Sequence, residues 1–294
     1  MEGGELGLRF QLEYGVFRVR SQRCISRSER YVGCADGCGS PPRRERVRGD
    51  ERNGRLGRFA SDQAGAAVTS MTQTTNRQRV FLTGATGYLG SRLLPLLLER
   101  GHDVTALVRA ASAKKVPAGC RVVVGNPLQA DTFAESVRGH DTLVQLVGVP
   151  KPSPWKGTQF RAVDGPSARA SIAAASAAAV RHVVYVSVAH PAPIMREYIA
   201  VRRDCEAAIA TARLLATILR PWYILGPKHW WPLALLPVYR VLERVPATRE
   251  AAMRLGLVSI REMLAALLWS IEHPPVKTRV IEVPDIRRLG RSEP

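Results

Sequence analysis

Cysteine is scarce in this chain, with five residues among 294, at positions 24, 34, 38, 120 and 205. So few cysteines, odd in number, do not form a disulfide framework, and the first residues lack the basic and apolar regions of an export signal. We therefore expect a reducing, cytoplasmic location. Cys34 and Cys38 have no second cysteine pair or histidine nearby, so we expect no metal site.

Long apolar runs are also missing. No stretch approaches the roughly 18 consecutive apolar residues that a membrane-spanning helix requires. The composition is 46% hydrophobic and 23% charged, which excludes disorder throughout the chain. The length suffices to bury most of the apolar surface in one large or two small domains.

Lysine is rare although the chain is basic. Lysine and arginine together number 43 against 25 acidic residues, and only six of the 43 are lysine. Such an excess suggests a polyanionic partner. The arginines are scattered and lack interleaved aromatic residues, so we expect no nucleic-acid surface; a phosphorylated small molecule needs only a few of them.

Residues 1–77 lack any sustained hydrophobic period of 2 or 3.6. They contain three of the five cysteines, an arginine-rich run at 43–48 and the turn-forming sequence Gly39-Ser40-Pro41-Pro42. We interpret this part as a disordered or mis-started extension, with Met71 as the natural start. The functional domain is predicted to occupy residues 78–294.

A glycine-rich turn opens that domain. The apolar segment 80–82 is followed by Thr83-Gly84-Ala85-Thr86-Gly87-Tyr88-Leu89-Gly90 and then by a leucine-rich segment that ends near Gly101. This order predicts a strand, a tight turn and a helix whose N-terminus binds a dinucleotide pyrophosphate. Gly84 permits the turn, Gly87 admits the phosphates, and Gly90 lets the helix pack on the strand. Thr86, Tyr88 and Leu89 complete the expected cofactor contacts.

Arg109 ends the second predicted strand, 104–108. An acidic residue in this region selects NAD, whereas an arginine pairs with the 2′-phosphate of NADP. The sequence therefore favours NADP, with NAD as the alternative. Lys114 and Lys115 either add to this pocket or lie on a solvated loop.

The chain from about 79 to 286 resembles the extended and atypical short-chain dehydrogenase/reductase superfamily, particularly its NmrA-like and epimerase/dehydratase-like members. The resemblance rests on the glycine turn, on Asn126 where the family has an acid near the adenine, and on Val147-Gly148, which would lie against the cofactor. It implies an α/β fold, a Rossmann-type doubly wound parallel sheet with a small C-terminal substrate lobe at about 228–294.

The same resemblance implies a catalytic set. Ser187, then Tyr198 and Arg202, then Arg220-Pro221 follow in the superfamily's order of serine, YxxxK and RPxxxxGP. In such enzymes the tyrosine is the acid or base and the cation four residues later lowers its pKa and holds the ribose. Here that cation is Arg202 instead of lysine, and Val188 and Ala189 stand where a hydroxyl is usual.

Further candidates surround this set. His190 is an alternative proton donor, and Pro221, Tyr223 and Ile224 are expected on the nicotinamide side. The aromatic, apolar stretch 229–239 either lines a substrate pocket or contacts a lipid surface.

Two functions follow from the sequence. One is an NADP(H)-dependent oxidoreductase acting on a small, mainly apolar carbonyl compound. The other is a non-catalytic dinucleotide-binding protein, acting as a redox sensor or an accessory subunit. We predict the first and keep the second as its alternative, which the departures at Arg202 and at 188–189 support; the glycine turn is expected in both.

Overall fold

The structure is a computed structural model that describes residues 77–227 and 242–292, all within the unit Val68–Pro294. The expected extension falls almost entirely on residues 1–76, and the aromatic stretch on 229–239, so both lie outside the described residues.

The described part is built on one parallel sheet of seven strands, in the order β3-β2-β1-β4-β5-β6-β9. β7 and β8 form a separate parallel pair. The strands are β1 Arg79–Thr83, β2 Asp103–Val108, β3 Arg121–Val124, β4 Thr142–Gln145, β5 His182–Val186, β6 Ala216–Arg220, β7 Tyr223–Leu225, β8 Leu257–Ser259 and β9 Arg279–Glu282.

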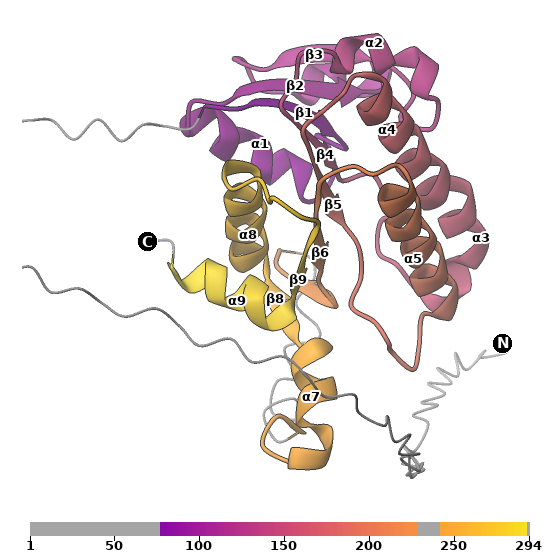
Figure 1. Cartoon of the computed structure of the whole chain (residues 1–294), viewed down its shortest axis with the longest axis vertical. Helices are drawn as coiled ribbons and strands as arrows, with labels where there is room; N and C mark the ends of the chain where they lie inside the picture. Colours follow the sequence, from indigo (N-terminus) through magenta and orange to yellow (C-terminus); the bar gives the residue numbers. More distant parts are fainter. Residues whose placement is uncertain (1–76, 228–241, 293–294) are drawn as a thin grey trace, which may run out of the picture. The chain divides into compact units, whose positions relative to one another are not determined.

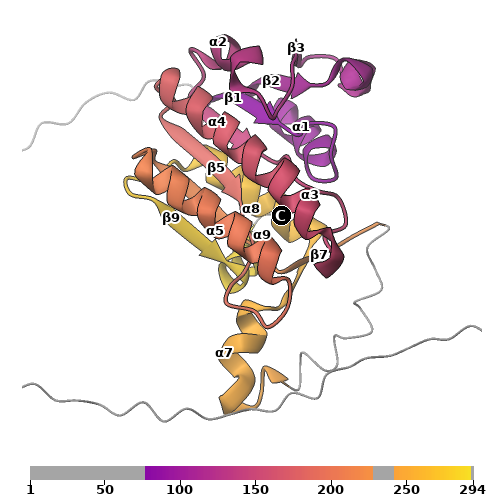
Figure 2. The same ribbon diagram turned by 90° about the vertical axis from the view of Figure 1, so that its right-hand side faces the viewer.

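Helices cover both faces of the sheet. Figure 1 shows α1, α8 and α9 on one face and α4 and α5 on the other, and Figure 2 looks onto α4 and α5 side by side. The α-helices are α1 Gly90–Glu99, α2 Ala134–Val137, α3 Gly157–Gln159, α4 Gly165–Ala177, α5 Arg196–Thr211, α7 Pro246–Arg254, α8 Ile260–Glu272 and α9 Val283–Ser292. Short 3-10 turns at Ala110–Lys115, Ala130–Thr132 and Pro154–Lys156 and a π-type turn at Phe160–Asp164 connect them.

The core divides at the central strand. Val80 and Leu82 of β1 pack with α1 and α8, whereas Phe81 between them packs with α4 and α5. All three are fully buried, because helices cover both faces of the strand. A parallel strand in this position is therefore apolar throughout its length. The Rossmann-type sheet predicted from the sequence is confirmed.

The described C-terminal residues pack with the main sheet. β9 pairs with β6 as an edge strand of the main sheet, and α8 and α9 belong to the same core as α1. α8 begins with a capping box: Glu262 Oε2 accepts from the Ser259 amide and Ser259 Oγ accepts from the Glu262 amide. Met263, Leu267 and Ile271 are fully buried, and burying such large apolar side chains is worth about 1.5–3 kcal/mol each. This helix is therefore part of the sheet's own packing.

The order of the strands in the sheet indicates where a ligand would bind. After β3 the chain crosses back over β1 to form β4, so the connections leaving β1 and β4 run in opposite directions. In open parallel sheets the crevice at such a switch point, beyond the carboxyl ends of the strands, is where ligands bind.

Candidate active site

A cleft of about 910 Å³ lies at this switch point. Its walls come from the turns that follow β1, β2 and β4, from the end of β5, from α5 and from the start of β7. The sequence-predicted residues that line it are Gly84, Thr86, Gly87, Tyr88, Leu89, Arg109, Asn126, Val147, Gly148, Ser187, Tyr198, Arg202, Pro221, Tyr223 and Ile224. Segments far apart in the chain thus meet in one cleft, as the resemblance implied.

The glycine turn has the shape that a dinucleotide cradle requires. Gly84 has φ of 73°, in the left-handed region, and a Cβ there would lie 2.8 Å from the carbonyl carbon of Leu146. A Cβ on Gly90 would collide with the Gly84 carbonyl oxygen, so only glycine lets α1 begin so close to β1. The Gly87 amide donates to Gly84 O at 2.9 Å and closes the turn. This backbone and the N-terminus of α1 suit a pyrophosphate.

Tyr88 forms the wall beside this turn. The Arg92 guanidinium lies over its ring, 4.5 Å from the centroid, and also donates to its carbonyl oxygen at 2.7 Å. The Tyr88 hydroxyl occupies the space where a Cβ on Gly226 would stand, so the turn after β1 and the segment after β7 are packed together here. Burial raises the pKa of Tyr88, so its phenol stays protonated at neutral pH.

Arg109 and Asn126 define the opposite end of the cleft. Arg109 is exposed, and no ion pair ties its guanidinium to any carboxylate in the described part of the chain. Lys114 and Lys115 are exposed and do not line the cleft, in line with a solvated loop. Asn126 is held in a tight turn: Oδ1 accepts from the Leu128 amide at 3.1 Å and Nδ2 donates to Gln129. The Asn126 oxygen can still accept one more hydrogen bond, and its nitrogen can still donate one more.

Tyr198 stands in the wall of the cleft on the first turn of α5. Its ring packs against Phe160 at 4.8 Å between centroids, and the Arg202 guanidinium lies 5.0 Å from the Tyr198 centroid. Burial raises the pKa of Tyr198, and the Arg202 charge only partly opposes this. The phenol is therefore protonated at neutral pH and able to donate.

Arg202 reaches the cleft but is held by protein groups. Its Nη2 donates to Asp164 Oδ1 at 2.5 Å, and its Nη1 donates to the Val186 carbonyl at 2.8 Å and to the Tyr185 hydroxyl at 3.3 Å. Asp164 is fully buried, and its other oxygen accepts from the Val149 amide. Burial raises the pKa of Asp164, while Arg202 and the Val149 amide favour its charged form.

The ion pair between Arg202 and Asp164 explains why position 148 is a glycine. A Cβ at Gly148 would lie 2.6 Å from Arg202 Nη2 and 3.2 Å from Asp164 Oδ1. The segment after β4 therefore rests directly on the ion pair, and any larger residue would displace it. The sequence analysis did not identify Asp164 as the partner of Arg202. The available signal was an acidic residue between apolar Val163 and the helix-starting Gly165-Pro166.

Ser187 is buried at the cleft wall, and its hydroxyl donates to Glu206 Oε1 at 2.5 Å. Arg220 also binds Glu206 through two nitrogens and reaches Glu282 at 3.0 Å. Burial alone would raise the pKa of Glu206, but the hydrogen bonds from Arg220 and Ser187 outweigh it and lower that pKa. The Ser187 proton is thus directed to Glu206, which leaves the oxygen lone pairs for other contacts.

His190 does not line this cleft, which corrects the expectation that it lies at the mouth as an alternative donor. It lies instead on a second hollow, with Nε2 3.8 Å from Glu206 Oε2. Lys151 and Gln159 do line the cleft and were not anticipated. Their signal is their place in the connection that leaves β4, next to the switch point.

The described residues contain no helix that is long and apolar enough to cross a membrane. Among the same residues, no group of three or more histidine, cysteine, aspartate and glutamate side chains is arranged to hold a metal ion.

Comparison with known proteins agrees with this geometry. Residues 84–228 match the family model described as NAD(P)H-binding. Ceramide reductase of Caulobacter vibrioides is 29% identical over 222 residues, which cover 74% of this chain and 68% of that protein. A ketoreductase of Stigmatella aurantiaca, which acts on a farnesylated dihydroquinoline oxide, is 36% identical over 118 residues, 37% of this chain and 33% of that protein.

A solved structure shows the same fold. The Bordetella bronchiseptica enzyme WbmH, in complex with NAD+, superposes with a TM-score of 0.53 and 18% identity, over 70% of this chain and 75% of that one. Residues 84–228 are an NAD(P)H-binding domain, and the sheet of the described residues has the fold of this NAD+-complexed enzyme.

Proposed function

We propose that the chain is an NADP(H)-dependent reductase of a mainly apolar carbonyl compound, with Tyr198 as the proton donor. The observation that carries this proposal is the position of Tyr198. Its ring lies in the wall of the same cleft as the glycine turn that follows β1, although 108 positions separate Gly90 from Tyr198.

The cleft residues suit NADP(H) better than NAD(H). Gly84, Gly87 and the N-terminus of α1 would hold the pyrophosphate, and Asn126 would meet the adenine with its remaining hydrogen-bonding positions. Arg109 carries an unpaired charge, within the described residues, at the end of β2, where a 2′-phosphate would stand. Val147, Gly148 and Pro221 would contact the nicotinamide half.

The chemistry that bound NADPH would supply is a hydride for the carbonyl carbon of the substrate. Tyr198 then donates its hydroxyl proton to the carbonyl oxygen, and the phenolate that remains recovers a proton from solvent. Because burial raises the pKa of Tyr198, the protonated form prevails at neutral pH, and this is the form that proton donation requires. Arg202, stacked on the ring, stabilises the phenolate through its charge.

The proposed substrate class rests on the apolar residues that line the cleft and on the names of two relatives. The connection after β4 contributes Val149, Pro150 and Pro152, and the segment before β7 contributes Trp222. An apolar pocket with few polar groups suits a lipophilic ligand. The relatives named ceramide reductase and farnesyl-dihydroquinoline ketoreductase also point to a lipophilic substrate.

A non-catalytic NADP(H)-binding role is the second candidate, and a specific observation favours it. Arg202 is engaged by Asp164, and the Ser187 hydroxyl is engaged by Glu206. Two polar groups that serve the reaction in the superfamily are therefore committed to protein partners. In this role the cofactor would bind without being oxidised.

The test is NADPH oxidation with a panel of long-chain, steroidal and aromatic ketones. The reductase proposal expects turnover in the wild type and a loss of about 10²–10⁴-fold in Tyr198→Phe, with NADPH affinity unchanged, because the hydroxyl serves the reacting oxygen. Arg202→Ala should lower both the turnover and the affinity for NADPH. Full turnover in Tyr198→Phe would overturn the mechanism, and NADPH binding without oxidation by any ketone would establish the second candidate.

A further inference from the structure

A second hollow, of about 450 Å³, lies at the N-terminal half of α5 and the loop before it. It shares no lining residue with the cofactor cleft. The residues that line it are His190, Pro191, Ala192, Arg196, Ile199, Ala200 and Arg203.

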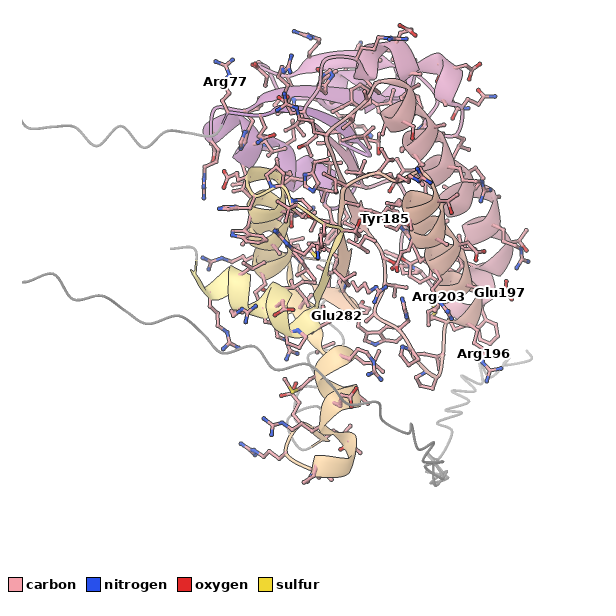
Figure 3. All side chains as sticks on the ribbon, viewed as in Figure 1. Arg77, Tyr185, Arg196, Glu197, Arg203 and Glu282 are labelled. Atoms are coloured by element: carbon pink, nitrogen blue, oxygen red, sulfur yellow. The ribbon has the colours of Figure 1, made fainter. Side chains whose placement is uncertain are left out.

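Three of the residues that line the hollow lie on one face of α5. Arg196, Ala200 and Arg203 stand at positions i, i+4 and i+7 of α5, so they follow one another along a single face. Figure 3 labels both arginines on this helix. The methyl group of Ala200 leaves open space between the two long side chains. Two guanidinium groups can therefore converge on one ligand.

Neither arginine is neutralised within the described residues. No carboxylate there forms an ion pair with Arg196 or Arg203, and the nearby Glu197 is bound by Arg161. α5 also begins without a side-chain cap, because Met195 at its N-cap carries no side-chain oxygen that could accept from the first amides of the helix. The positive end of the helix dipole thus adds to the two charges.

His190 also lines the hollow, and no hydrogen bond within the described residues engages its Nε2. This nitrogen is buried and lies 3.8 Å from Glu206 Oε2, whose charge Arg220 neutralises. The charged groups around the ring are Arg203 and Glu206 on α5, Arg220 on β6 and Glu282 on β9. Burial and the two arginines lower the pKa of His190, so the ring is neutral at neutral pH and does not repel a cation or attract an anion by itself.

We propose that this hollow binds the phosphoryl group of an anionic ligand, held by Arg196 and Arg203. A guanidinium pair on a small-residue floor matches a tetrahedral anion with several acceptor oxygens. The phosphoryl group belongs either to a soluble metabolite or to a lipid headgroup, and the chemistry of recognition is the same. Binding should tighten as the pH falls, because a bound anion favours the protonated form of His190.

The test uses the full chain saturated with NADPH, so that the glycine turn is occupied, and titrates inorganic phosphate while the His190 ring resonances are followed by NMR. We expect saturable shifts that weaken at least about tenfold in Arg196→Ala/Arg203→Ala, the scale of a lost charge-assisted bond. Ala200→Leu fills the hollow while keeping both charges and should also weaken binding. Arg261→Ala removes an exposed arginine from the first turn of α8 and should leave it unchanged.

Vesicles distinguish the two sources. Binding to phosphatidylcholine vesicles only when they contain phosphatidic acid, and its loss in the double variant, would assign a lipid headgroup. Phosphate binding without vesicle binding would assign a soluble ligand. Absence of phosphate-dependent shifts, or equal affinity in wild type and Ala200→Leu, would overturn the proposal. A failure of NADPH binding would concern the other cleft alone, and the titration can be repeated without NADPH.

Discussion

Arg202 and Asp164, 38 positions apart, form a buried ion pair with Nη2 2.5 Å from Oδ1. The carboxylate is fully buried and the guanidinium nearly so, with side-chain exposures of 0% and 7%. The pair joins the start of α4 to α5 beneath the connection that leaves β4. It therefore fixes the wall of the cleft against which Tyr198 stands.

Asp164→Asn should destabilise the fold strongly. The change leaves the Arg202 charge buried without its counter-ion, and breaking such a pair costs about 3–5 kcal/mol. Denaturant unfolding measures the loss. Glu135→Gln breaks an exposed pair with Arg138 and should cause little or no change. Equal stability of Asp164→Asn and wild type would show that Arg202 finds another partner.

Arg109→Ala should lower NADPH affinity by about 10-fold to 100-fold and leave NADH affinity unchanged. The guanidinium offers a charge-assisted bond to the 2′-phosphate that NADH lacks, worth about 1.5–3 kcal/mol. Fluorescence titration of the wild type and the variant with NADPH and with NADH measures the two affinities. Lys114→Ala is the control, because this residue is exposed and does not line the cleft. A wild type that binds NADH as tightly as NADPH would contradict the assignment.

Stability should fall as the pH drops from about 6.5 toward 4, with a contribution from His182. Burial lowers the pKa of this histidine to about 4, so the unfolded chain takes up a proton in this window and the folded chain does not. The lost stability from this residue is about 3 kcal/mol at the acid end. His182 Nε2 lies 3.0 Å from Thr217 Oγ1, a contact that glutamine can replace.

His182→Gln should therefore flatten the dependence of unfolding free energy on pH over this range. The comparison with wild type isolates this residue, since the other titrating groups are common to both proteins. Parallel curves for the two proteins would assign the acid sensitivity elsewhere.

A chain shortened to begin at Met71 should fold and bind NADPH as the full chain does. The described core draws on residues from Val80 to Ile286, and residues 1–70 carry no periodic apolar face. Thermal melting and NADPH titration of both chains measure this. Loss of cooperative melting in the shortened chain would mean that the first 70 residues contribute to the fold.

The sequence alone determined the local elements of the cofactor end. The apolar β1, the Gly84–Gly90 turn and α1 follow from residue types at short spacing, since turn geometry and helix starts depend on near neighbours. The capping box of α8 was readable for the same reason. The resemblance to the short-chain dehydrogenase/reductase superfamily implied the doubly wound sheet.

Only the tertiary structure decided what the reactive side chains touch. Arg202 pairs with Asp164, Ser187 donates to Glu206, and His190 lies outside the cleft. A long or polar side chain takes its partner from whichever elements the fold packs beside it, and these lie 19 to 38 residues away. The spacing of Tyr198 and Arg202 fixes them one helical turn apart, but it cannot show that a buried carboxylate from α4 reaches the guanidinium.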